Sequence, residues 1–260
     1  PSLLPIGSRV VVWGGVDPLD GSYLADGAIY DPAADTWTAM PALPLQDIQA
    51  ADVIGSSTDL YVVVEAPTPS LFHLGEGKDN WAREDDPPAF PAVDLSRATW
   101  TGNGFVWLLY PRSGSNAVAI DYDNVARAWS SEATVTPLPA SLGQPLVWTG
   151  PDAVVIGSAT AKPPLLAAAA LDLASTTWRP LRAGDGCATE AASWTGSVLL
   201  QPYPARWFTE IDGCRQLPMP PGPTREGIQP VWTGGELIVW SGSQGSLGVP
   251  PRSDGVIYRP

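Results

Sequence analysis

The length, composition and charge of this chain limit the kinds of protein that it can be. It has 260 residues, of which 44% are hydrophobic and 16% are charged, so it can bury a core and is not a disordered chain. Its formal net charge of −13 would repel phosphate groups, so we expect no nucleic-acid partner and no attraction to an anionic membrane surface.

The first segment of the chain combines a short apolar run with strong turn residues. After Arg9, residues Val10–Trp13 form an apolar run that ends in Gly14 and Gly15, and Tyr30 then stands seven residues before Trp37. Runs of Val, Ile and Trp of this length, separated by Gly and Asp, are typical of short β-strands joined by turns. No apolar run approaches the ~20 residues that span a bilayer, so we expect no membrane insertion.

A turn with the sequence Trp-Thr-Gly marks the later segments. It occurs at Trp100–Gly102, Trp148–Gly150, Trp194–Gly196 and Trp232–Gly234, with weaker copies at residues 53–55 and 6–7. Successive copies lie 38 to 48 residues apart, and no stretch sustains the apolar spacing of a helix. A period of this size without a helical pattern predicts an all-β chain of radially repeated sheets.

The second half of each segment repeats as well. A Tyr or Leu precedes a Trp by seven residues in four segments, and the alanine run before Leu171 keeps this register, so we expect a strand there. Six units are predicted in one domain that spans residues 1–260. They cover residues 1–41, 49–88, 96–137, 144–182, 190–220 and 228–260.

The strand that ends in Gly14 and Gly15, followed by Tyr30 and Trp37, resembles the kelch repeat. The resemblance covers nearly the whole chain, although the second, fourth and fifth units lack the glycine pair. It implies a six-bladed kelch-type β-propeller of the galactose oxidase central-domain-like superfamily, with four-stranded blades. The sixth unit stops near Tyr258, where its last strand is due. We therefore expect a last blade that is incomplete or closed by the N-terminal strand.

The sequence offers no catalytic set, and we favour a protein that is not an enzyme. Its single histidine, His73, lies in an apolar run, where we interpret it as a packed strand residue. The copper oxidases that share this blade type use two histidines, as the resemblance implies, so copper oxidase activity is rejected. Few His and Cys ligands are available for zinc or iron, and the acidic loops lack the spacing of a calcium loop. We expect no metal and no cofactor.

Most of the twelve tryptophans occupy repeating positions, which favours packing between blades over ligand contact. Only Trp107 and Trp207 depart from the pattern. They are the aromatic candidates for ligand contact, although ordinary strand residues would explain them as well.

A ligand site is predicted where the first strands of the units begin. Counting back five or six residues from a turn glycine finds a polar residue in five units, and the loops between second and third strands would add arginines on the same face. Such groups around the mouth of a central channel can orient a ligand, or they can simply bind neighbouring backbone and water. The candidates are Gln49, Arg97, Gln144, Glu190, Gln229, Arg112, Arg206 and Arg252.

Three functions stay open, and the preferred one is a non-catalytic binding or scaffold module that recognises a protein or carbohydrate ligand as a monomer. The second is a carbohydrate-active enzyme resembling sialic-acid epimerases, in which arginines hold a carboxylate and Glu190 transfers a proton. The third is a propeller domain of a larger protein whose activity lies elsewhere.

Residue usage and the first residue favour an exported protein. The chain has only two lysines and starts at Pro1, so we expect an extracellular, cell-surface or periplasmic protein whose leader has been removed. Cys187 and Cys214 lie within one unit, and their spacing is compatible with a disulfide or with two thiols.

Overall fold

Every regular element that the structure describes is a β-strand. The computed structural model describes residues 2–259 apart from 16, 18–20, 46–47, 49, 67, 91, 113–116, 131–132, 136–145, 159–165, 176, 182–192, 202–205, 210–212, 220–221, 223–224, 226–227 and 241–253. The described residues thus confirm the all-β prediction. None of their elements is a helix long and apolar enough to span a membrane.

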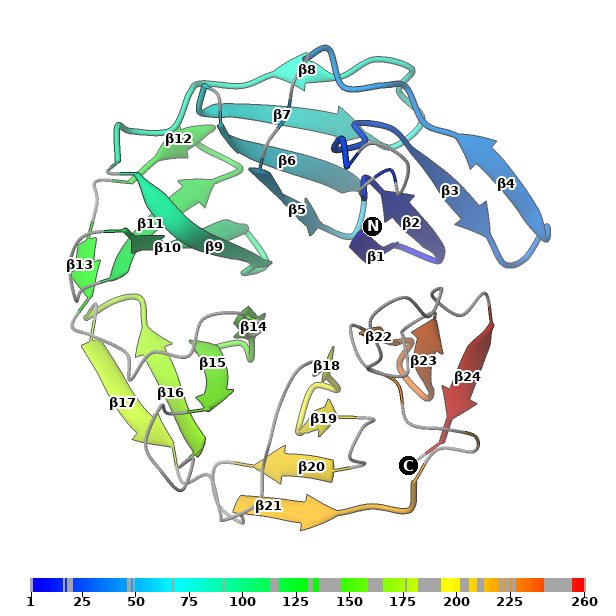
Figure 1. Cartoon of the computed structure of the whole chain (residues 1–260), viewed down its shortest axis with the longest axis vertical. Helices are drawn as coiled ribbons and strands as arrows, with labels where there is room; N and C mark the ends of the chain where they lie inside the picture. The colour runs from blue at the N-terminus through cyan, green and yellow to red at the C-terminus, as the bar shows by residue number, and fades with distance from the viewer. Residues whose placement is uncertain are drawn as a thin grey trace. The chain divides into compact units, whose positions relative to one another are not determined.

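The chain divides into two compact units, and the first comprises residues 1–112 and 119–132. It contains nearly all of three antiparallel sheets, each with its strands in chain order (Figure 1). The first sheet has β1 (Ser2–Ile6), β2 (Arg9–Trp13), β3 (Gly27–Asp31) and β4 (Thr36–Ala39). The second has β5 (Ala50–Gly55), β6 (Asp59–Ala66), β7 (Ser70–Gly75) and β8 (Ala82–Arg83), and the third has β9 (Val93–Trp100), β10 (Gly104–Pro111), β11 (Ala117–Asp123) and β12 (Ala128–Trp129).

The second unit comprises residues 113–118 and 133–260. It begins with the short β13 (Ala133–Val135) and continues with three more sheets. These are β14 (Leu146–Trp148), β15 (Asp152–Ser158), β16 (Leu166–Asp172) and β17 (Thr177–Leu181); β18 (Ser193–Trp194), β19 (Leu199–Gln201), β20 (Arg206–Thr209) and β21 (Gly213–Gln216); and β22 (Gln229–Trp232), β23 (Leu237–Trp240) and β24 (Gly255–Tyr258). The alanine run lies in β16, which confirms the predicted strand.

The sheets have the strand order of β-propeller blades. Among the described residues, five sheets follow a path of four strands and form complete blades, whereas β22, β23 and β24 form a sheet of three, so five blades are seen where six were predicted, and the sixth unit is the incomplete one. The N-terminal strand does not close the last sheet. Ser2–Ile6 pairs residue by residue with Arg9–Trp13 across a tight turn in which Gly7 has a φ of 55°, because a neighbouring strand forms a local hairpin at little entropic cost.

The four Trp-Thr-Gly turns have one geometry, as their shared sequence predicts. In each turn the Thr backbone N–H donates to the carbonyl three residues later at 2.8 to 3.0 Å, and the Thr Oγ1 donates to the same oxygen at 3.1 to 3.2 Å. The glycine that follows has a φ between 98° and 105°. Glycine adopts this conformation without the steric cost that a Cβ adds.

Neighbouring sheets within a unit pack through their first strands and through recurring tryptophans. Strands β1, β5 and β9 are neighbours in the first unit, as β14, β18 and β22 are in the second (Figure 1). The Trp81 indole N–H donates to the Pro41 carbonyl at 2.9 Å, and Trp129 donates to the Asp85 carbonyl at 2.9 Å. Each bond reaches back to the segment after the preceding sheet, which supports a packing role for the repeated tryptophans. Trp107, a candidate for ligand contact, is fully buried.

Candidate functional site

The structure describes the side chains of two of the eight predicted site residues, Arg97 and Arg112. For two others it describes the backbone alone: Gln229 is the first residue of β22 and Arg206 the first of β20. The remaining four, Gln49, Gln144, Glu190 and Arg252, lie outside the described residues. The convergence of all eight on one ligand therefore stays a prediction.

Arg112 lies where the loop after a second strand was expected to lie, beside the start of a first strand. Its backbone N–H donates to the Ala92 carbonyl at 2.9 Å, and its Nε donates to the Val93 carbonyl at 3.2 Å. Val93 is the first residue of β9, and the Arg112 residue is exposed. This end of the third sheet therefore presents a cation to solvent.

Arg97 lies near the middle of β9 rather than at its start. Its Cα partner across the sheet is Leu108 of β10, and the residue is half-buried. One guanidinium nitrogen donates to the Ser96 carbonyl at 2.6 Å, which holds the side chain against its own strand. The positive charge of Arg97 acts on two acidic side chains of the second sheet, because it lowers the pKa of each of them.

These acidic side chains, Asp52 of β5 and Glu65 of β6, form what we call the carboxyl pair. The hydroxyl of Ser96, which is 3% exposed, is in hydrogen-bond contact with both carboxyl groups. The buried Trp107 indole also donates to Asp52 Oδ2 at 3.0 Å. Residues from the first strands of two neighbouring sheets, β5 and β9, therefore meet at one point.

Burial raises the pKa of both carboxyl groups. For Asp52, the hydrogen bonds from Ser96 and Trp107 and the charge of Arg97 offset part of this effect. The pKa of Glu65 is raised by burial and by the negative charge of Asp52, while Ser96 and Arg97 act in the opposite direction. Two adjacent carboxyl groups of this kind titrate together, and retaining one proton on the pair is favoured.

The contacts of Ser96 agree with a retained proton. A serine hydroxyl carries one hydrogen and can donate to only one acceptor at a time. Its contact with a second carboxyl oxygen is favourable when that carboxyl group carries a proton and donates to the serine oxygen. With one proton retained, the carboxyl pair would accept and donate hydrogen bonds at once.

Sequence reasoning missed Asp52, Glu65 and Ser96, because none of them recurs in the other units. The sequence did contain one weak indication of these residues, namely charged side chains within otherwise apolar strands. Asp52 interrupts the run Ala50–Gly55, and Glu65 ends the valine run of β6. A charged residue inside a strand of small and branched apolar residues is costly to bury and so indicates a specific partner.

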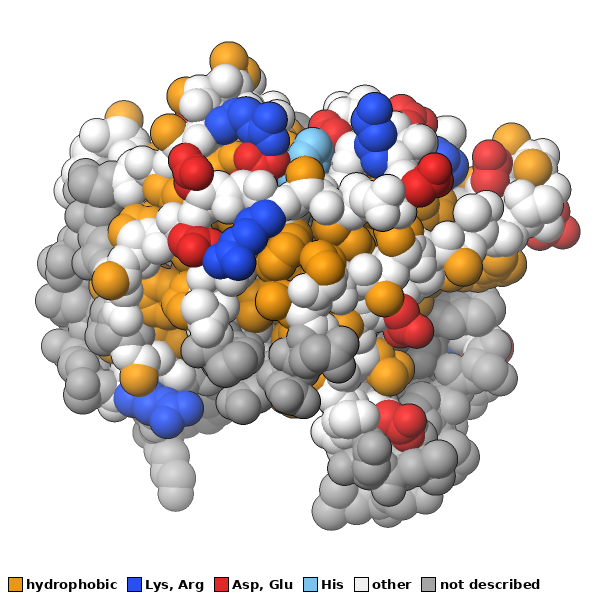
Figure 2. Space-filling model, turned by 90° about the horizontal axis from the view of Figure 1, so that it is seen from above, with side chains coloured by type: hydrophobic (Ala, Val, Ile, Leu, Met, Phe, Trp, Pro, Cys, Tyr) orange, Lys and Arg blue, Asp and Glu red, His pale blue; other side chains and the backbone are white. Residues whose placement is uncertain are grey.

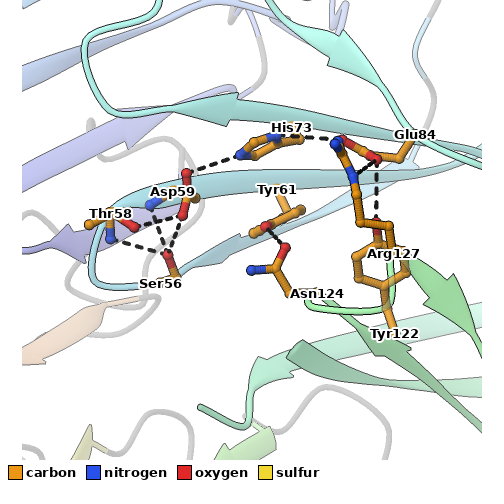
Figure 3. A network of polar contacts seen from close by, with 9 residues as sticks. All are labelled: Ser56, Thr58, Asp59, Tyr61, His73, Glu84, Tyr122, Asn124 and Arg127. Carbon is orange, nitrogen blue, oxygen red and sulfur yellow. Dashed lines mark hydrogen bonds and ion pairs between the residues drawn. The ribbon is translucent and has the colours of Figure 1, made fainter. Parts of the chain in front are cut away.

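A second polar network surrounds His73 on β7 (Figure 3). Its Nε2 lies 3.0 Å from Asp59 Oδ1 and its Nδ1 lies 3.5 Å from Glu84 Oε1, while its ring stacks on Tyr61 with centroids 4.9 Å apart. The side chain is 23% exposed, and Figure 2 shows it in pale blue with acidic and basic groups nearby. His73 is thus a packed strand residue, as expected, because its ring stacks on Tyr61. The two carboxylates that face its ring nitrogens were not predicted from the sequence.

The network joins the second sheet to the third. The Glu84 side chain is 6% exposed and accepts hydrogen bonds from Arg127 Nε at 2.9 Å and from the Tyr122 hydroxyl at 3.4 Å. Both ring nitrogens of His73 face carboxylates, so the imidazole is placed to link acidic groups rather than to take a proton from a substrate. We assign the network a structural role.

Hydrogen bonds change the acidity of Asp59 within this network. Burial alone would raise its pKa, but hydrogen bonds from Thr58, His73 and Ser56 and the nearby imidazole outweigh burial and lower the pKa. Its ionised form is therefore the one that the fold stabilises.

Neither a metal site nor a comparison with known proteins identifies a function for this chain. Among the described residues, no group of three or more His, Cys, Asp or Glu side chains is arranged to hold a metal ion. No protein-family model matches the sequence, and no curated protein matches it either.

Proposed function

We propose that this chain is a six-unit kelch-type β-propeller that binds a ligand without transforming it. The observation that carries the proposal is the placement of Arg97 beside the carboxyl pair, where two neighbouring sheets meet. A recognition site needs polar groups that are held in place, and here internal hydrogen bonds fix Asp52, Glu65 and Arg97 on packed, regular strands.

A carbohydrate is the ligand class that fits these groups best, and a protein surface is the alternative. Sugar hydroxyls both donate and accept hydrogen bonds, which matches a carboxyl pair that retains a proton next to an arginine. A phosphorylated ligand fits poorly, because the net charge of −13 opposes its approach. We further propose that the protein is exported, which the scarcity of lysine supports, and that it acts as a monomer.

The proposal is tested by screening the purified chain against an array of neutral and acidic glycans. Arg97→Gln removes the cation and leaves a shorter, uncharged polar side chain, and we expect it to weaken any true hit by about tenfold. Arg83→Gln serves as the matched control, because Arg83 pairs with Asp86 on an exposed outer strand. Hits that survive Arg97→Gln, or that are lost equally in Arg83→Gln, would contradict this site.

The carboxyl pair also favours a second function, proton transfer on an acidic sugar, as in enzymes resembling sialic-acid epimerases. A raised pKa favours the protonated form from which a carboxyl group donates as a general acid, and Arg97 can hold a substrate carboxylate. Incubation with acidic sugars in D₂O would reveal enzyme activity as exchange of carbon-bound hydrogen, and Glu65→Gln should abolish it. If a glycan binds but no hydrogen is exchanged, the enzymatic function is contradicted and only the binding function remains.

A further inference from the structure

A pocket of about 230 Å³ lies between the first and second sheets of the first unit. Its floor is aliphatic and consists of Ile6, Met40, Leu60 and Leu74, none of them more than 7% exposed. Among the described residues, no aromatic side chain lines it. The pocket contains neither Arg97 nor the carboxyl pair, so it is separate from the site described above.

The rim of this pocket carries charges of both signs. Arg9 of β2 forms an ion pair with Glu76, which follows β7, and this pair neutralises one charge of each sign. Lys78, Asp31 and Asp79 then remain. The charges left at the rim are therefore one ammonium group and two carboxylates.

The backbone of Lys78 is held in place at the rim. Its N–H donates to the Gly75 carbonyl at 3.1 Å, and its side-chain stem passes beside Gly75. The ammonium group pairs with no described residue. Lys78 therefore has a fixed backbone and an ammonium group that is available to a ligand.

The acidic side of the rim is also partly fixed. One carboxylate oxygen of Asp31, Oδ1, accepts backbone N–H bonds from Ala33 at 2.9 Å and from Ala34 at 3.2 Å, which fixes the orientation of the carboxylate and leaves Oδ2 out of these bonds. Asp79 adds a second, exposed carboxylate, and Thr36 and Thr38 add hydroxyl groups. A cationic group on a ligand would find acceptors here.

We propose that this pocket binds a small aliphatic zwitterion, the chemical class of a free amino acid with an aliphatic side chain. The ligand carboxylate meets Lys78, its ammonium group meets Asp31 and Asp79, and its hydrocarbon part covers the aliphatic floor. The volume is below the range of drug-sized ligand sites, which suits a molecule of this size.

The lining disfavours the common alternatives. Phosphates and dicarboxylates bring two negative charges toward Asp31, Glu76 and Asp79, and only one unpaired ammonium group can compensate them. Sugars and nucleobases gain much of their affinity by stacking on aromatic rings, which this lining does not offer.

The test compares L-leucine with two analogues that each lack one charge, 4-methylpentanoate and 3-methylbutylamine, by calorimetric titration of the full chain. We expect leucine to bind and each analogue to bind at least about tenfold more weakly, because each forfeits one charge-assisted contact. Either analogue binding as tightly as leucine would overturn the zwitterion assignment, and no saturable binding of leucine would overturn the proposal.

Substitution of the two lysines locates the binding. Lys78→Gln should weaken leucine binding by about tenfold, and Lys162→Gln, at the only other lysine of the chain, should leave it unchanged. Thermal unfolding of both variants shows whether they are folded. Equal leucine affinity in folded Lys78→Gln and in the unsubstituted chain would show that the pocket is not the binding site. Because Arg97 lies elsewhere, Arg97→Gln should not alter leucine binding, which separates this test from that of the proposed function.

Discussion

At the scale of single residues, the buried carboxyl groups make the stability of the fold depend on pH. The raised pKa of Asp52 means that the folded chain holds this proton more tightly than the unfolded chain does. Its contribution to stability is therefore greatest below the pKa of the unfolded state and is lost as the pH rises through the folded value. Glu65 acts in the same direction.

Asp52→Asn is expected to remove this dependence. The amide can still accept the Trp107 N–H bond without carrying a buried charge, so at pH 7 we expect the variant to be more stable by about 1 kcal/mol. Denaturant unfolding of both proteins between pH 4.5 and 8 measures the difference, which should shrink as the pH falls. Parallel pH profiles for the two proteins would show that Asp52 is fully ionised in the fold.

At the scale of elements, the turn at Thr233 provides a test of backbone conformation alone. Gly234 has a φ of 101°, whereas Gly235 is not in the left-handed region, and a Cβ at either position would meet no atom within 4 Å. Gly234→Ala should therefore cost about 1–3 kcal/mol through strain, while Gly235→Ala should change stability little. Denaturant unfolding compares the pair, and equal costs would indicate that the repeated turn relaxes.

The outer-strand tryptophans test the bonds between sheets. Trp81→Phe keeps an aromatic ring and removes the N–H that donates to Pro41, so we expect a loss of about 1 kcal/mol. Trp37 holds the same repeat position, is 60% exposed and contacts Tyr30, so Trp37→Phe is the matched control and should be close to neutral. A similar loss in both variants, measured by urea unfolding, would assign the effect to ring size rather than to the hydrogen bond.

At the scale of the whole molecule, the net charge of −13 predicts a response to salt. Like charges repel more in the compact state than in the expanded one, and ions screen this repulsion. The melting temperature should therefore rise between low and physiological ionic strength, and by the same amount in NaCl and KCl. A fall would mean that attractive ion pairs such as Glu84 with Arg127 outweigh the repulsion.

The repeat made much of the fold predictable, because a backbone conformation that recurs in each unit requires the same residue types each time. A glycine with positive φ and a threonine that bonds across its own turn appear as Trp-Thr-Gly in four places, and the strands follow between the turns. The repeat pattern did not settle whether the last blade is incomplete or closed by the N-terminal strand. Ser2–Ile6 forms a local hairpin with Arg9–Trp13 instead, which leaves the last sheet with three described strands.

The polar sites were harder to predict because their members come from different repeats. Ser96 lies 44 residues from Asp52 and 31 from Glu65, and no periodic signal connects them. Arg97 was found because it could be counted back from a turn glycine, but counting could not show that it lies in the middle of β9 beside two acids. Likewise the neighbours of His73 could be known only once β6 and β7 were paired.

The bonds from Trp81 and Trp129 also restrict where this chain can change in length. Each indole reaches a carbonyl four residues after the preceding tryptophan of the series, at Pro41 after Trp37 and at Asp85 after Trp81. Inserting or deleting even one residue in these two short segments would move the acceptor away from the ring. Variation in length should therefore be confined to connections that supply no acceptor for an indole among the described residues.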